Sequence, residues 1–474
     1  MSFSPFRRSL PQRFLLVLTS FLQKSGLAFS DALPEEAIQA AFDAEDVAFA
    51  QEEDDVYTPA LTLWAFLSQA LFKEEQRSCL AAVSRVVALL VGLGRPACSS
   101  NTSTYCRARR KLPESVLRRL VYETADGCER VVSDGWLWKE RHVQLLDGTT
   151  VSMPDTPANQ EAYPQTSSQE EGLGFPIARM VVLLSLATAM VSGLAIGPYS
   201  GKETGEMALF RQLLDRLHSG DVVLADRYFC SYFMICLLRE RNVDVVTRLH
   251  QSRTADFRRG KRLAAGDHLV EWQRPDRPEW MDQATYERMP ASIQVREVEV
   301  KVPPGKGFRA DVVVVVTTLT DARKDTRDDL AQLYCKRWLV ELDIRTIKCT
   351  LAMDVLRCKS PEMVRKEVWT CLLAYNLIRR TMLQSALASG RSPRSLSFTA
   401  AMQQIAASWV LAAVISQPTM DSLIAANQEH LPGHRVGHRP NRVEPRAVKR
   451  RPKILALLTK PREQARAELI AATV

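Results

Sequence analysis

Two stretches of sequence that share one pattern decide the fold: residues 142–150 read HVQLLDGTT, and residues 221–229 read DVVLADRYF. In each stretch a short, mostly aliphatic run leads to an aspartate, Asp147 in the first and Asp226 in the second. Such runs predict buried β-strands. We expect Asp147 to end its strand, because Gly148 lets the chain turn and leaves the carboxylate at the edge of the sheet. Taken singly, an aspartate at the end of a strand is most often a turn residue or a helix cap.

The segments around these aspartates predict an α/β sheet. In chain order, the predicted elements are strands at His142–Asp147, Ile177–Ala189 and Val191–Ile196, an amphipathic helix at Gly205–Leu217, and a strand at Asp221–Ala225. Three sequential strands, a helix and then another strand is the order expected for a ribonuclease H-like core. A helix at Ser231–Arg241 and a strand at Val243–Leu249 continue the alternation.

Changes of pattern divide the chain, which is too long for one ordinary core. A β-rich insertion is indicated by prolines, by strands at Val295–Val302 and Val312–Thr318, and by few helical signals. After it, we expect a long helix from Asp328 through Lys348. The predicted segments are a helical N-terminal domain at 1–125, the first part of the core at 126–249, the β-rich insertion at 250–325, the second part of the core at 326–382, and a helical C-terminal region with a basic tail at 383–474.

Charge is distributed unevenly along the chain. The net charge of +9 is modest for 474 residues, but Leu431 to Val474 holds eleven Lys and Arg against three Glu, whereas Asp31 to Val56 holds ten acidic residues and no Lys or Arg. This segregation indicates a polyanionic partner such as nucleic acid. The ten cysteines form no C-x-x-C pair, and no His stands at zinc-finger spacing. We therefore expect reduced thiols in a cytoplasmic protein.

The predicted helix at Ala331–Lys348 carries a narrow polar stripe. Four side chains at offsets 0, 3, 7 and 14 fall within about 60° of one another, at about 100° per residue. They are Tyr334, Arg337, Glu341 and Lys348, and Arg345 joins the same face. A carboxylate flanked by cations and a phenol suits a metal ion beside a phosphodiester backbone. The alternative is a solvated helix face with i,i+4 ion pairs.

A second basic segment follows a Ser/Thr-rich stretch at residues 99–105. Its cations are Arg107, Arg109, Arg110 and Lys111. A polar helix start followed by cations suits the binding of phosphates, so we expect this segment to contact DNA. The alternative is again a solvated helix face.

Four further acids are expected to carry no chemistry. Glu203 and Glu206 precede a predicted helix, where the helix dipole favours acids, so we interpret them as structural rather than as a second catalytic pair. Asp155 is expected in a loop. Asp343 is expected to point away from the polar stripe, at about 180°. We expect Asp155 and Asp343 to resemble the candidate ligands in exposure and to tolerate substitution.

The tetrad Tyr334, Arg337, Glu341 and Lys348 is the YREK signature, and with it the chain resembles the DDE transposases of insertion sequence family four. Further stretches similar to that family are Asp147–Thr150, Asp155–Gln160, Asp226–Phe229 and Glu444–Pro452. The resemblance covers about residues 50–465. Its motifs are specific in combination rather than singly.

This resemblance implies a fold and an activity. It implies a ribonuclease H-like core with a β-rich insertion between the second Asp and the Glu, which agrees with the break at 250–325. It further implies a cytoplasmic, nucleoid-associated bacterial enzyme that cuts the terminal inverted repeats of a mobile element through a DNA hairpin and joins them to target DNA. By position, Asp147, Asp226 and Glu341 become ligands of two Mg²⁺ ions, for which Mn²⁺ substitutes. Because joining two ends needs two sets of carboxylates, we expect a homodimer on DNA.

The resemblance also implies particular DNA contacts. Tyr334, Arg337 and Lys348 become contacts to the terminal phosphates, and Arg227, beside the second Asp, is a further candidate. In hairpin-forming relatives a Trp of the insertion stacks on a flipped base. Here the insertion offers Trp272 and Trp280, and neither aligns clearly with that residue. The alternative for both is a buried aromatic in a small β structure.

Two other functions remain open from the sequence. A structure-specific nuclease on the same fold would cleave DNA without joining it, but the basic tail and the N-terminal domain favour the transposase. A domesticated DNA-binding protein would have lost catalysis, and the intact acids argue against it.

Overall fold

The computed structural model of the chain describes residues 41–44, 56–92, 94–302, 311–411, 417–437 and 458–472. Most of the acidic stretch at 31–56 and the whole of Glu444–Pro452 lie outside these ranges. Within them, no helix is both long enough and apolar enough to cross a membrane.

Among the described residues, one mixed sheet of nine strands organises the fold, in the order β3-β2-β1-β4-β5-β9-β8-β7-β6. The strands β1, β4 and β5 are mutually parallel neighbours, and every other neighbouring pair is antiparallel. The five core strands are β1 Val143–Ser152, β2 Ile177–Ser185, β3 Val191–Pro198, β4 Val222–Ala225 and β5 Asp244–Arg248. The α/β class and the strands predicted around the two aspartates are confirmed.

The remaining four strands lie within residues 250–325 and continue the same sheet. They are β6 Lys261–Ala264, β7 Asp267–Gln273, β8 Ser292–Val302 and β9 Asp311–Thr317. The last of them, β9, pairs with the end of β5, so the insertion extends the core sheet edge to edge. The sequence predicted β8 and β9 but neither β6, β7 nor the short helix α10 Gln283–Arg288. Charged residues dominate β6, which hides its strand character from a hydrophobic pattern.

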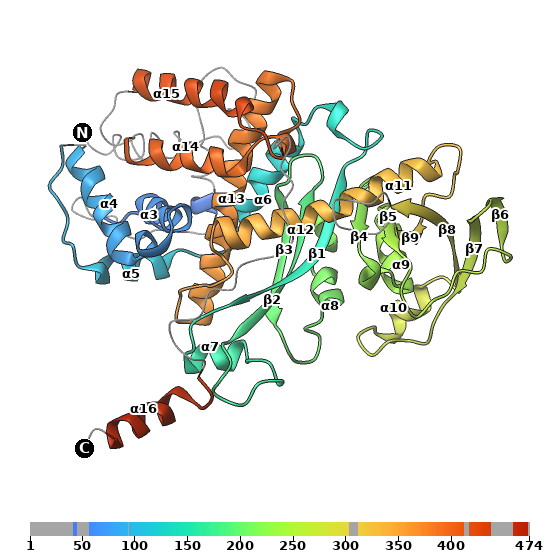
Figure 1. Cartoon of the computed structure of the whole chain (residues 1–474), viewed down its shortest axis with the longest axis horizontal. Coiled ribbons are helices and arrows are strands. Elements are labelled where there is room, and N and C mark those ends of the chain that lie inside the picture. Colours follow the sequence, from blue (N-terminus) through green and yellow to red (C-terminus); the bar gives the residue numbers. More distant parts are fainter. Residues whose placement is uncertain are drawn as a thin grey trace.

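Helices cover both faces of the sheet (Figure 1). On one face, α8 Glu206–Arg211 and α9 Tyr232–Glu240 share an apolar cluster with Leu146 and Val223. On the other face, α6 Glu114–Glu129, α11 Arg327–Cys335, α12 Leu339–Arg345 and α13 Pro361–Ser389 share a cluster with the alternate strand residues. In Figure 1, α11 and α12 follow one another across the middle strands.

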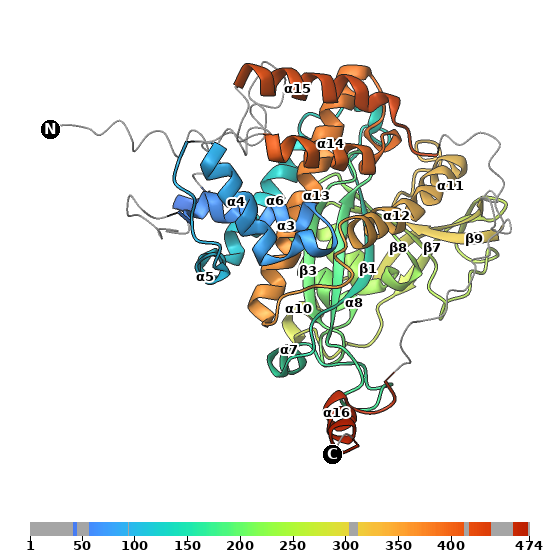
Figure 2. The same cartoon turned by 60° about the vertical axis from the view of Figure 1, so that its left-hand side comes forward.

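The N-terminal helices pack directly on the core. The helices α3 Pro59–Leu71, α4 Cys79–Gly92 and α5 Thr102–Lys111 belong to the same apolar cluster as the sheet, and Figure 2 shows them beside α6 and α13. The domain boundaries expected at residues 125 and 382 lie within α6 and α13. Further helices in the described ranges are α7 Pro157–Ala162, α14 Phe398–Leu411, α15 Gln417–His430 and α16 Arg462–Ala471.

The long helix expected from Asp328 through Lys348 is interrupted twice. A 3-10 turn at Lys336–Trp338 separates α11 from α12, and a π-helical turn at Thr346–Thr350 follows α12. A uniform rotation of about 100° per residue therefore does not hold along its whole length. The ends of the polar stripe are placed by these irregular turns.

Candidate active site

Asp147 lies in the middle of β1 and not at its end, which corrects the expectation from the sequence. The strand continues through Gly148, which pairs with Val181 on β2. A Cβ on Gly148 would stand 2.3 Å from the carboxyl group of Glu206 on α8. The glycine therefore makes no turn here, but gives room for the Glu206 carboxyl group against the strand.

The registers of the parallel strands bring Asp147 and Asp226 side by side. Leu145 pairs with Leu224, so the residues two positions further along, Asp147 and Asp226, fall at the same level of the sheet. On β5, Thr247 pairs with Ala225, which puts Arg248 at this level as well. Because alternate residues of a strand share a face, all three side chains lie on the face that α11 and α12 cover.

Asp226 begins a 3-10 turn directly after β4, as its position in the sequence predicted. Its Oδ1 accepts a hydrogen bond of 2.8 Å from the Tyr228 backbone N–H, which fixes the carboxyl group at the edge of the sheet. Arg227 and Tyr228 are both exposed next to it. The exposed cation beside the carboxyl group is available to an anionic ligand.

Glu341 and Arg337 face this edge from α12 and the turn before it. Arg337 Nη2 donates a 2.8 Å hydrogen bond to Glu341 Oε1, and the Glu341 side chain is 40% exposed. Tyr334, one turn earlier, is buried, and burial raises the pKa of its phenol while Arg337 and Arg248 lower it. The tetrad thus shares one face, but Tyr334 contributes from within the protein.

The carboxyl groups at this edge interact electrostatically. The pKa of Asp147 is raised to about 6, chiefly by burial; the negative charges of Asp226 and Glu341 act in the same direction, whereas the Gly148 N–H and Arg337 lower it. Burial also raises the pKa of Glu206, with a contribution from Asp226 in the same direction. A cation bound between Asp147 and Asp226 would lower the pKa of Asp147 by offsetting the negative charge of its neighbour.

Lys348 points back to the strand that carries Asp147. Its Nζ donates to the carbonyl oxygen of Thr150 at 2.7 Å and to Thr149 Oγ1 at 3.3 Å. The π-helical turn at Thr346–Thr350 widens the helix where this contact forms. Arg345 is exposed on α12.

The basic segment on α5 lies among the N-terminal helices, away from this edge. Arg109 points inward, where its Nη1 donates to Gln69 Oε1 at 2.9 Å and its guanidinium lies 4.8 Å from the Phe66 ring centre. It is therefore a packing residue, which corrects its assignment as a phosphate contact. Arg107, Arg110 and Lys111 are exposed.

Of the two Trp candidates, Trp272 is not accessible to a DNA base. It is 4% exposed, its Nε1 donates to Glu297 at 3.0 Å, and Arg253 covers its ring at 3.9 Å. Trp280 is half-buried, with the Arg211 guanidinium 4.0 Å from its ring centre. The structure removes Trp272 as a stacking platform and leaves Trp280.

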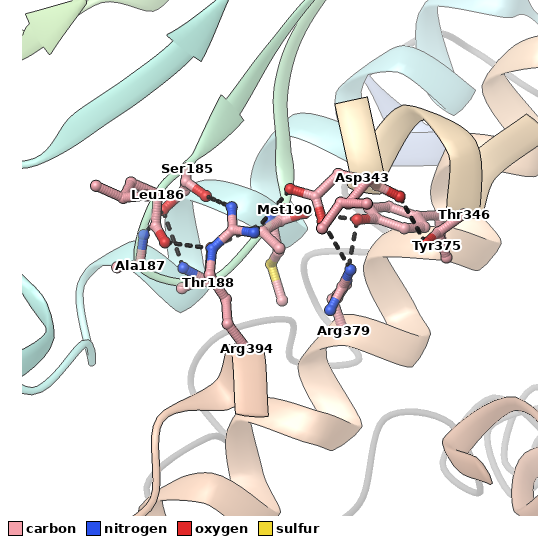
Figure 3. A network of polar contacts seen from close by, with 12 residues as sticks. Ser185, Leu186, Ala187, Thr188, Met190, Asp343, Thr346, Tyr375, Arg379 and Arg394 are labelled. Carbon is pink, nitrogen blue, oxygen red and sulfur yellow. Dashed lines mark hydrogen bonds and ion pairs between the residues drawn. The ribbon is translucent and has the colours of Figure 1, made fainter. Parts of the chain in front are cut away.

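Asp343 also differs from expectation. It points away from Glu341 as predicted, but it is 3% exposed and accepts hydrogen bonds from Arg379 and Arg394 (Figure 3). It is not an acid of similar exposure and cannot serve as a neutral control. Asp155, which is exposed and accepts from Gln160, fits that role.

Two charged residues near the acids were not among the site residues expected from the sequence. Arg248 ends a strand parallel to β4, and the common edge reached by parallel strands is the signal that points to it. Glu206 was assigned to the helix dipole. The signal in the sequence is Gly148 on β1, because a glycine within a strand can leave space for a side chain such as Glu206.

The donor set suits a hard divalent cation, since Asp147, Asp226 and Glu341 offer carboxylate oxygens. In the part of the chain that the structure describes, no three His, Cys, Asp or Glu side chains are grouped closely enough to hold a metal ion. The ion pair of Glu341 with Arg337 directs one of the three carboxylates elsewhere. The Arg337 contact engages one of the two carboxylate oxygens of Glu341, Oε1.

Comparisons with known proteins identify the family. The model of the transposase DDE domain family matches residues 138–377 of this chain. The chain is 27% identical over 359 residues to the transposase InsG for insertion sequence element IS4 of Escherichia coli, covering 72% of this chain and 73% of InsG. It is 26% identical over 145 residues to the putative transposase InsZ of Escherichia coli, covering 29% of this chain and 46% of InsZ.

Among solved structures, a piggyBac transposase synaptic complex with hairpin DNA matches with a TM-score of 0.41 and 9% identity, over 90% of this chain and 87% of that one. The DDE domain match covers more than half of the chain and includes Asp147, Asp226 and Glu341. The chain therefore belongs to the DDE transposase family.

Proposed function

We propose that this protein cuts and joins the ends of a mobile DNA element by two-metal-ion phosphoryl transfer, with Asp147, Asp226 and Glu341 as the metal ligands. One observation carries the proposal: the parallel register of β1 and β4 sets Asp147 beside Asp226, on the face where α12 presents Glu341. The strand order β3-β2-β1-β4-β5, in which β2 alone runs opposite to the other four strands, supports a ribonuclease H-like core within the sheet.

Divalent metal dependence follows from the DDE domain, and we propose two Mg²⁺ ions, for which Mn²⁺ substitutes. When bound, such a pair stabilises the attacking and leaving oxygens of an in-line displacement. Asp147 and Asp226 are already held at one edge of the sheet. Glu341 reaches them by exchanging its ion pair with Arg337, which a change of side-chain rotamer on a fixed helix allows.

The cations around the acids are proposed to hold the DNA backbone. Arg337, once released by Glu341, faces the same edge as Arg227, and Lys348 lies against the strand of Asp147. Tyr334 supports Arg337 from within the protein, and Arg345 extends the basic surface along α12. Guanidinium groups suit phosphate recognition because they donate two parallel hydrogen bonds.

The remaining parts of the reaction are proposed from the resemblance. The exposed α5 cations Arg107, Arg110 and Lys111 contact the terminal inverted repeats, and a homodimer brings two ends and target DNA together. Cleavage proceeds through a hairpin, for which Trp280 is the remaining stacking candidate in the insertion. Its contact with Arg211 on α8, the helix that carries Glu206, connects it to the neighbourhood of the acids.

The test is a cleavage and joining assay on labelled duplex DNA that carries one end of the element. Wild-type protein should cut and join with Mg²⁺ or Mn²⁺, and Ca²⁺ should permit binding without turnover. Asp226→Ala and Glu341→Ala should bind the DNA without cutting it, whereas the matched control Asp155→Ala should cut normally. Near-normal cleavage by both Ala variants would refute the proposed site, and cleavage without joining by the wild type would indicate a nuclease.

A further inference from the structure

A buried ionic network lies behind α12, on the side away from the sheet edge (Figure 3). Asp343 Oδ1 accepts from Arg379 Nη2 at 3.0 Å, and Asp343 Oδ2 accepts from Arg394 Nη1 at 2.8 Å. The Asp343 and Arg379 side chains are 4% and 7% exposed, and that of Arg394 is 15% exposed. One carboxylate thus balances two guanidinium groups in a nearly closed space.

The two arginines tie Asp343 to the turn between β2 and β3. Arg394 Nη2 donates to the Ser185 carbonyl oxygen at 2.8 Å, and its Nε donates to that of Leu186. Arg379 Nε donates to the Tyr375 hydroxyl at 2.9 Å, and that hydroxyl donates to the Ala189 carbonyl oxygen at 2.9 Å. Asp343 therefore links α12 to the turn between β2 and β3 and to α13, in addition to the apolar contacts of Val340 and Ile344.

The helix α12 needs such an attachment because it is short. It has seven residues, with a 3-10 turn before it and a π-helical turn after it. These irregular turns interrupt the regular hydrogen bonding that would otherwise set its rotation. Glu341 and Asp343 are two positions apart, which is about 200° around a helix, so anchoring one face directs the other.

We propose that Asp343, held by Arg379 and Arg394, is a positioning residue that fixes the rotation of α12 and so directs Glu341 toward Asp147 and Asp226. This inference rests on the proposed function, because it gives Glu341 a metal to bind. Asp343 itself touches neither metal nor DNA. A bond network behind a ligand acts by orienting it, and loss of such outer contacts typically weakens metal affinity about 10–100-fold.

The rival explanation is that the network only stabilises the fold. A second buried ion pair, elsewhere in the protein, serves as a control that distinguishes this explanation from the proposal. In the insertion, Arg296 is fully buried and donates from Nε and Nη2 to the two carboxyl oxygens of Asp267 at 2.8 and 2.6 Å. Arg296→Lys breaks this bidentate contact while keeping its charge. It should lower thermal stability without changing the rotation of α12.

The experiment measures Mn²⁺ binding to the full-length protein by electron paramagnetic resonance, which requires no turnover. Asp343→Asn should weaken Mn²⁺ binding by about tenfold or more. Arg394→Lys, which keeps the charge and one donor, should weaken it less than Arg394→Gln. Arg296→Lys should lower the melting temperature but leave the Mn²⁺ affinity within about twofold of wild type, because its hydrogen bonds go to Asp267 and to the Asp325 carbonyl before α11, and not to α12.

Each outcome decides between the explanations. Unchanged Mn²⁺ affinity in folded Asp343→Asn and Arg394→Gln would overturn the inference, and so would an equal loss of affinity in Arg296→Lys. If Asp343→Asn does not fold, the Mn²⁺ affinities of Arg394→Lys and Arg394→Gln decide: the inference requires weaker binding by Arg394→Gln than by Arg394→Lys. Failure of the wild type to bind Mn²⁺ or to cut DNA would instead refute the proposed function, which keeps the two failures distinct.

Discussion

The two faces of α12 place a carboxylate in opposite environments. Glu341 is 40% exposed and has one hydrogen-bonded arginine, whereas the Asp343 side chain is 4% exposed and has two. The insertion follows the second pattern, since Glu297 accepts from both Trp272 and His268 in the interior. At the sheet edge, by contrast, Asp147 has a raised pKa and acidic neighbours. The structural charges are thus paired inside the protein, whereas the candidate functional carboxylates lie near one another and, at Glu341, are partly exposed.

The largest expected effect is on activity at the sheet edge. Asp147→Asn keeps the shape of the side chain but removes its charge, so we expect cleavage of end DNA to fall by at least about 10³-fold, more than loss of one oxyanion-hole donor costs. The melting temperature in metal-free buffer should stay the same or rise, because repulsion by Asp226 and Glu341 is removed. The check is a cleavage assay combined with thermal unfolding. A lower melting temperature together with normal cleavage would show that Asp147 is a structural rather than a functional acid.

The next effect is on stability, on the opposite face of α12. Asp343→Ala leaves two buried guanidinium groups without a counter-charge, which should reduce the free energy of unfolding by about 3–5 kcal/mol. Glu341→Ala removes a partly exposed ion pair and should cost about 1 kcal/mol or less. Denaturant unfolding of both variants measures the difference. Equal losses would mean that exposure does not separate structural from functional acids on this helix.

These contrasts show what a local sequence pattern conveys. Helical periodicity correctly placed Asp343 away from Glu341, but it could not indicate the environment, because Arg379 and Arg394 come from later segments of the chain. The strands with aliphatic runs were likewise predictable, and so was Asp226 at the end of β4. What escaped prediction depends on partners distant in sequence.

Gly148 illustrates the same limit at the active-site strand. Asp-Gly-Thr-Thr is typical of a turn, yet β1 runs through it because β2 supplies backbone partners as far as Ser152. The fate of Trp272 on β7 likewise depends on a neighbouring strand. It pairs with a residue of β8 and is buried, whereas a stacking platform would have to be exposed. Pairing between strands, rather than composition, decided both outcomes.

A smaller effect is expected from filling the space beside Gly148. Gly148→Ala places a Cβ where the Glu206 carboxyl group lies, at 2.3 Å, so overpacking should cost about 1–3 kcal/mol of stability. The double variant with Glu206→Ala should recover most of this loss, because the shorter side chain leaves the space open. Thermal unfolding of the single and double variants tests the contact. Additive losses would show that Glu206 does not occupy this position.

The smallest expected effect is a shift in pH dependence. A cation binds the ionised form of Asp147, whose pKa is raised to about 6, so Mn²⁺ binding should be present above that pH and be lost as the pH falls through it. Because Arg337 lowers this pKa, Arg337→Ala should move the midpoint of Mn²⁺ binding to higher pH. The shift should be less than about one pH unit, which corresponds to a lost interaction energy between Arg337 and Asp147 below about 1.4 kcal/mol. Binding at pH 8 should persist.

Arg345→Ala provides the control for this shift, since Arg345 is an exposed cation on the same helix and is not among the groups that set the pKa of Asp147. Stability without metal should show the opposite pH dependence to Mn²⁺ binding: the raised pKa of Asp147 contributes stability below the ordinary value of 3.8, and that contribution is lost as the pH rises through about 6. Paramagnetic resonance of Mn²⁺ across pH 5–8 measures the midpoints. A downward shift in Arg337→Ala, or an equal shift in Arg345→Ala, would show that Arg337 does not tune Asp147 and that the charge balance of this edge is set elsewhere.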